Sequence, residues 1–78
     1  MAVNAFILIQ AEVGTAGDVA REIGALAQVL SAEVAIGPYD VIARAEAADM
    51  DELGAVVVNA IGNVPGVERT NLCPIVNL

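Results

Sequence analysis

Apolar residues in the first part of the chain follow two different periods. Positions 5–9 are all apolar, which is typical of a strand that is covered on both faces. From position 19 onward, apolar residues recur every three or four positions, as on one face of a helix. The pattern predicts a strand over residues 4–12 and a helix over residues 15–30. The predicted helical stripe consists of Val19, Ile23, Leu26, Ala27 and Leu30.

The residue pattern in the middle of the chain predicts two strands joined by a tight connection. The strands are expected over residues 32–37 and 41–47, and the segment Gly37-Pro38-Tyr39-Asp40 between them is rich in turn-forming residues. In the later strand, small residues alternate with larger or charged ones. We expect the small face to lie against helices and the face bearing Ile42, Arg44 and Glu46 to point to the other side of the sheet.

A second helix and a last strand complete the pattern. The helix is predicted over residues 49–63, and Pro65-Gly66 ends it. The strand is predicted over residues 67–77, at an edge of the sheet, because Pro74 has no backbone N–H to donate. The predicted buried stripe of this helix consists of Met50, Leu53, Val57, Ile61 and Val64.

Both predicted helices begin with residues suited to capping. Thr15 followed by Asp18 has the spacing of a capping box, and so has Asp49 followed by Glu52. In each case the first side chain is expected to accept a hydrogen bond from a backbone amide in the first turn.

The order of elements, β-α-β-β-α-β, predicts an α+β fold of the ferredoxin-like type. In this fold two helices cover one face of a four-stranded antiparallel sheet, and the other face stays open. Because the first strand is apolar on both sides, the open face must be buried by something else. We therefore expect one domain over residues 1–78 that forms a homodimer through its sheet.

The amino-acid composition also indicates that the domain buries apolar surface against a partner. The chain has 78 residues and is 58% hydrophobic, above the roughly 45–50% of soluble domains. Its longest apolar run has five residues, whereas a membrane span needs about 20, and no basic segment precedes a signal-like apolar run. We expect a cytoplasmic protein that does not act at a membrane.

The charge balance argues against direct binding of nucleic acid. Ten acidic residues stand against Arg21, Arg44 and Arg69, which gives a net charge of −7. Binding to phosphates requires a basic surface that displaces counterions, and the sequence has none.

The sequence is poor in catalytic side chains. There is no histidine, and Cys73 is the single cysteine. Zinc sites built from His and Cys, and nucleophilic pairs such as Cys-His, therefore cannot form within the chain. We expect no metal, no cofactor and no catalytic residue.

The segment Gly37-Pro38-Tyr39-Asp40 resembles the glycine-x-tyrosine/phenylalanine-aspartate signature of the Lrp/AsnC effector domain, also called the RAM domain. The helix start Ala-Asp-Met-Asp-Glu-Leu (residues 48–53), the segment at residues 61–67 and Thr70 also match the family pattern. The resemblance covers residues 3–77. Members usually carry an N-terminal helix-turn-helix, for which these 78 residues leave no room, so the chain resembles a stand-alone form.

The resemblance implies a function and a site. Domains of this family pair through their sheets, and the dimers assemble into rings, here an octamer or decamer. Amino acids or related small molecules bind between dimers, and a DNA-binding relative is a candidate partner in regulating transcription. By position, the resemblance implies an effector site formed by Gly37, Tyr39, Asp40, Met50, Thr70, Cys73 and Pro74.

Each of these residues also has a structural interpretation. Asp40 could pair with an α-ammonium group or simply bond backbone amides of its own turn. Tyr39 could contact a ligand or anchor an interface. Met50 fits a core position, and Cys73 fits a small buried hydrophobic residue.

Two other functions are compatible with the same fold. One is an enzyme of the dimeric α+β barrel type, such as a cofactor-free monooxygenase or an isomerase, and the other is an ACT-like amino-acid-binding module. Fold alone does not separate them, because function depends on the site. The loop at residues 37–40 favours the effector domain.

Overall fold

The computed structural model describes residues 2–78, apart from the side chain of Val58, and has the predicted β-α-β-β-α-β order. A π-helical turn, η1, continues the second helix. The elements are β1 (Val3–Ala11), α1 (Ala16–Gly24), β2 (Val29–Val34), β3 (Val41–Ala47), α2 (Met50–Ala55), η1 (Val56–Ile61) and β4 (Val67–Pro74).

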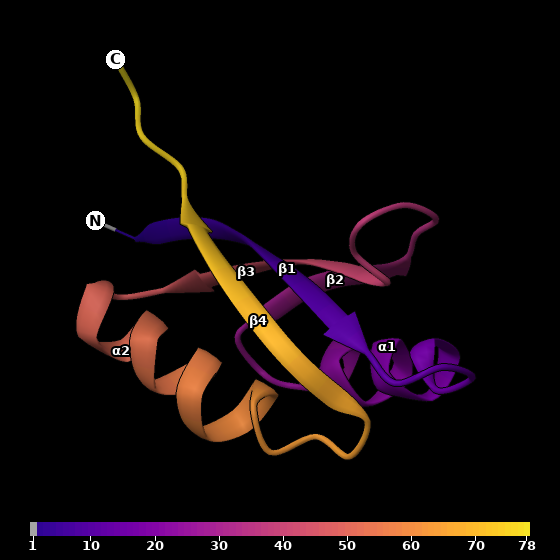
Figure 1. Ribbon diagram of the computed structural model, residues 1–78. Coiled ribbons are helices and arrows are strands. Elements are labelled where there is room, and N and C mark those ends of the chain that lie inside the picture. Colours follow the sequence, from indigo (N-terminus) through magenta and orange to yellow (C-terminus); the bar gives the residue numbers. More distant parts are fainter. Residues whose placement is uncertain (1) are drawn as a thin grey trace.

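The four strands form one antiparallel sheet in the order β2-β3-β1-β4. The predicted edge position of the last strand is confirmed, and Pro74 pairs with Ala5 at the end of that edge. Figure 1 shows both helices below the sheet, whereas the β2–β3 connection and the C-terminal segment rise above it. The sheet therefore has one covered face and one open face.

The covered face is made of small and branched apolar side chains. Ile7 and Ile9 of β1 are fully buried, and β3 contributes Val41 and three alanines, as its alternation predicts. The small side chains let the helices approach closely, and Val19, Ile23, Leu53 and Ile61 fill the space from the helix side.

The open face carries the other side chains of the same strands. Phe6 and Ile42 remain 41% and 36% exposed, and Leu8 between them is half-buried. The guanidinium of Arg44 lies 5.6 Å from the centre of the Phe6 ring, its cross-strand neighbour, in cation–π geometry. In a single subunit this face thus leaves a central apolar strip in contact with water.

The first helix is shorter than its apolar period predicts. It ends at Gly24, and β2 begins at Val29, which pairs with Ala45 and is buried. Leu30, predicted on the helical stripe, is 58% exposed. Glycine is a poor helix former, and pairing of β2 with β3 satisfies the backbone groups that a longer helix would have used.

The second helix widens where it packs against the sheet. After Ala55 the helix becomes π-helical, and the amide of Gly62 donates to the carbonyl of Val57 at 2.9 Å. The wider turn buries both Val56 and Val57. Met50, predicted on the buried stripe, is instead 48% exposed at the first turn, and Leu53 is the first residue of the stripe that is buried. No helix within residues 2–78 is long and apolar enough to cross a membrane.

Of the two predicted capping boxes, one is confirmed and one is wrong. Asp49 accepts a hydrogen bond from the amide of Glu52 at 2.8 Å, and the Glu52 carboxylate accepts one from the amide of Ala48 at 3.3 Å. Thr15 occupies the cap position of α1, but its hydroxyl donates to the carbonyl of Glu12 at 2.7 Å and caps nothing.

Candidate functional site

The candidate effector loop, residues 35–40, is a closed connection between β2 and β3. The amide of Ala35 donates to the carbonyl of Asp40 at 2.9 Å, which closes its base. Gly37 at its tip has a φ angle of 143°, a backbone conformation that residues with a Cβ rarely adopt. Ile36 projects fully into solvent beside it. The loop therefore exposes one glycine, one proline and one isoleucine at its tip and keeps its polar anchors at the base.

Asp40 anchors this loop to the end of β1. Its amide donates to the carbonyl of Ile9 at 2.9 Å, and its carboxylate oxygen Oδ2 accepts a hydrogen bond from the amide of Ala11 at 2.8 Å. The pairing of β1 with β4 shifts register between Gln10 and Ala11, and the Asp40 carboxylate bonds the Ala11 amide at this bulge. Of the two interpretations of Asp40, bonding to backbone amides applies, but the amide that Oδ2 accepts from belongs to another strand and not to its own turn.

Two further hydrogen bonds hold the loop to the open face. The side-chain amide of Asn71 in β4 donates to the Tyr39 hydroxyl at 3.0 Å, and the side chain of Gln10 in β1 donates to the Pro38 carbonyl at 3.3 Å. Gln10, Ala11 and Asn71 were not among the residues expected at the site. No sequence signal could have identified them, because they lie about 30 positions from the loop and only strand pairing brings them near it.

The other four predicted site residues lie at the far end of the subunit or, like Thr70, beside the loop's end of β1 with the side chain on the other face. Met50 follows the far end of β3, whose seven residues place it about 20 Å from Asp40. Thr70 pairs with Ile9 on the covered face and is half-buried. Cys73 pairs with Phe6 on the open face and is exposed, so its interpretation as a buried hydrophobic residue is wrong. One subunit thus brings together Gly37, Tyr39 and Asp40 but not the remaining four.

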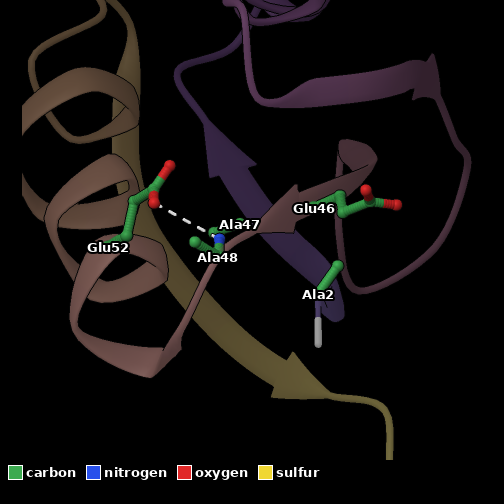
Figure 2. A pocket seen from close by; sticks show the side chains of 5 residues that line it. All are labelled: Ala2, Glu46, Ala47, Ala48 and Glu52. Carbon is green, nitrogen blue, oxygen red and sulfur yellow. Dashed lines mark hydrogen bonds between the residues drawn. The ribbon is translucent and has the colours of Figure 1, made fainter.

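A shallow cavity of about 380 Å³ lies at the far end of β3, near Met50 (Figure 2). Ala2, Ala47 and Ala48 line it, and the side chains of Glu46 and Glu52 lie on opposite sides of Ala47 and Ala48. The Glu52 carboxylate already accepts the Ala48 amide in the helix cap. The described part of the chain holds no group of three His, Cys, Asp or Glu side chains that could bind a metal ion.

A second cavity, of about 320 Å³, opens on the open face between the start of β1 and the C-terminal segment. Arg44, Asn4 and Asn77 provide its polar groups, and Val3 and Ile75 provide its apolar groups. Neither this cavity nor the one in Figure 2 contains a residue of the loop at 35–40. In a single subunit, neither of these two cavities therefore provides the loop with a binding pocket.

Charges are distributed unevenly between the faces. Strand register places Arg44, Arg69, Glu33 and Glu46 on the open face, so positive and negative charges balance there. The net charge of the chain is −7, so the acidic excess lies on the rest of the molecule. Within residues 2–78 the one ion pair, Arg21 with Asp18 at 2.6 Å, is on the surface of α1. The open face is thus the least acidic surface of the subunit.

Comparison with solved structures finds the same architecture in other proteins. A Thermus thermophilus protein is 32% identical with a TM-score of 0.91, over 97% of this chain and 95% of that one. AsnC of E. coli is 19% identical with a TM-score of 0.89, over 97% of this chain and 52% of its own. A transcriptional regulator of Neisseria meningitidis, solved as an L-Met complex, is 21% identical with a TM-score of 0.84, over 96% and 50%. The chain spans about half the length of these two regulators.

Sequence comparison agrees with the structural one. A comparison with curated proteins gives no match. The sequence model of the Lrp/AsnC ligand-binding domain, however, matches residues 4–77, nearly the whole chain. The match includes the β2–β3 loop, both helices and the open face of the sheet. The chain belongs to the Lrp/AsnC ligand-binding domain family.

Proposed function

We propose that this protein is an oligomeric effector-binding domain that takes part in the transcriptional regulation of metabolism. The observation that carries the proposal is the loop at residues 35–40, which is anchored by hydrogen bonds beside a sheet face left open. Membership of a ligand-binding family supplies the regulatory role. Residues 1–78 act as one domain in this proposal.

The open face pairs with the same face of a second copy. A two-fold interface requires a self-complementary surface, and this face combines an exposed apolar strip with balanced charges. Burying Phe6, Leu8 and Ile42 supplies a hydrophobic driving force of roughly 25 cal/mol per Å². The acidic excess elsewhere favours this face over others for pairing, because like-charged surfaces repel.

The effector binds where copies meet, after dimers assemble into an octamer or decamer. Support comes from the separation of the candidate residues, because the loop at 35–40 and the region of Met50 lie at opposite ends of β3. A second copy can bring the Met50 and Pro74 end of one subunit to the loop of another. The site is therefore incomplete in an isolated subunit.

An amino acid is the proposed effector. The Asp40 carboxylate holds Ala11 through Oδ2, which leaves Oδ1 as the oxygen available to an α-ammonium group. Ile36 and Gly37 are exposed at the loop tip, and free backbone amides in such a turn would suit a carboxylate. The Neisseria meningitidis regulator was solved with L-Met, so methionine is the first ligand to test.

The domain acts through assembly and not through catalysis or direct contact with DNA. Its acidity opposes binding to phosphates, so a DNA-binding relative in the same ring provides contact with the genome. The proposed compartment is the cytoplasm, and no cofactor is required.

Native mass spectrometry and thermal unfolding, each with and without a panel of amino acids, test this function. We expect a dimer or a multiple of dimers, and one amino acid that raises stability. A ligand at 100 times its dissociation constant stabilises the folded state by about 2.7 kcal/mol. A monomer at all concentrations would refute the assembly. A ring that no amino acid stabilises would refute the effector role.

A further inference from the structure

The hydrogen bond between Tyr39 and Asn71 connects the candidate effector loop to the open face. Asn71 pairs with Leu8 in the middle of β4, and the same row of the sheet contains Ile42. Its side chain therefore stands on the open face. To reach it, the Tyr39 side chain leaves the start of β3 and spans β1, which lies between β3 and β4. Figure 1 shows the loop rising on the side of the sheet away from the helices.

The loop has a second attachment on the same face. The Gln10 side chain, which pairs in register with Arg69, donates to the Pro38 carbonyl. Both bonds join exposed groups, so water competes for them. The Asp40 bond to Ala11 is different, because it is partly buried and belongs to the strand end itself. The base of the loop is thus held within the subunit, whereas Pro38 and Tyr39 depend on exposed bonds.

Exclusion of water changes the strength of such bonds. A hydrogen bond in a dry, low-dielectric environment is stronger than the same bond in water, and an unpaired partner there is costly. A second subunit packed on the open face would cover the row that contains Leu8, Ile42 and Asn71. Covering this row desolvates the Asn71 amide and favours the conformation in which Tyr39 accepts its hydrogen.

We propose that Asn71 is a positioning residue for Tyr39, and that pairing of the open faces orders the effector loop through this bond. The inference rests on the proposed homodimer and adds a route by which assembly and ligand binding are coupled. Because coupling between two binding events is reciprocal, an effector that holds Tyr39 in this position also strengthens the dimer.

Hydrogen exchange measured by mass spectrometry tests the proposal without any ligand. The full chain is compared above and below its dimer dissociation concentration, together with Tyr39→Phe and Asn71→Leu. We expect exchange in the peptide covering residues 35–40 to slow about three- to tenfold on dimerisation of the parent chain. Both variants should still dimerise, but their loops should exchange fast in the monomer and in the dimer.

A matched control separates the hydrogen bond from a general effect on the face. Glu33→Gln changes an exposed residue in the same row of the sheet, on β2, and should leave the loop's response intact. If the loops of Tyr39→Phe and Asn71→Leu slow on dimerisation as the parent loop does, the partner shields the loop directly and the inference is wrong while the homodimer stands. A parent chain that never dimerises overturns both. Tyr39→Phe keeps the ring and so guards against misfolding of the other variant.

Discussion

The carboxylate of Asp40 accepts a hydrogen bond from the backbone amide of Ala11 at 2.8 Å, across 29 positions of sequence. Ala11 is the last residue of β1, where a bulge shifts the pairing with β4. One side chain of the candidate loop therefore completes the hydrogen bonding of a different strand. The position of the loop and the end of β1 depend on each other.

Replacing Asp40 should separate this structural role from any role in binding. Asp40→Ala leaves the Ala11 amide without its acceptor, and we expect a loss of about 1–3 kcal/mol in unfolding free energy by denaturant titration. Asp40→Asn keeps an acceptor oxygen and should cost less than about 1 kcal/mol. If Oδ1 binds an ammonium group, Asp40→Asn should still lose the thermal shift produced by an amino acid. If both variants have the same unfolding free energy as the parent chain, the bond to Ala11 contributes nothing to stability.

Gly66 should tolerate no side chain. Its φ is +96°, and an added Cβ would lie 2.8 Å from the Thr15 hydroxyl and 3.0 Å from Val19 Cγ2. We expect Gly66→Ala to destabilise the fold by at least about 2 kcal/mol in thermal or chemical unfolding. Gly54→Ala is the matched control, since nothing lies within 4 Å of its added Cβ and it sits in α2. It should stabilise by up to about 1 kcal/mol.

A charge on the open face should separate the subunits without unfolding them. Ile42→Arg puts a guanidinium at a position that faces solvent in the single subunit, beside Glu33. In a sheet-on-sheet dimer the same group would be desolvated, at a cost of several kcal/mol. We expect a dissociation constant at least about a hundredfold higher by analytical ultracentrifugation, with unchanged circular dichroism.

The control for this variant is Val13→Arg, because Val13 is fully exposed in the loop between β1 and α1. It adds the same charge and should leave the assembly intact. A normal dimer in Ile42→Arg would place the interface on another surface.

The two helix starts should respond unequally to loss of their cap residues. Asp49→Ala removes the acceptor of the Glu52 amide, and we expect a cost of about 1 kcal/mol in unfolding free energy. Thr15→Ala removes only the bond to the Glu12 carbonyl and should cost less than half as much. A larger loss at Thr15 would mean that its hydroxyl supports α1 in a way that the cap geometry does not explain.

Most of the architecture could be predicted from local pattern. The alternation in residues 41–47 identified β3 with its bounds and both of its faces, and Pro74 identified an edge strand. The errors came where two patterns overlapped. Leu30 fits the helical period that begins at Val19, but pairing of Val29 with Ala45 made that segment a strand. Strand pairing is a long-range term that a local window does not contain.

The sequence alone determined the order of elements, the apolar character of both faces of the first strand, and the acidity that opposes phosphate binding. These properties depend on side-chain period and on charge, which are local or additive. Tertiary structure alone decided which residues surround the candidate effector loop. Ala11, Gln10 and Asn71 reach it because antiparallel pairing places β1 and β4 beside the start of β3. It also separated Met50, Thr70, Cys73 and Pro74 from that loop. Strand direction places Met50, Cys73 and Pro74 towards the other end of the sheet, and the alternation of side chains places Thr70 on the other face.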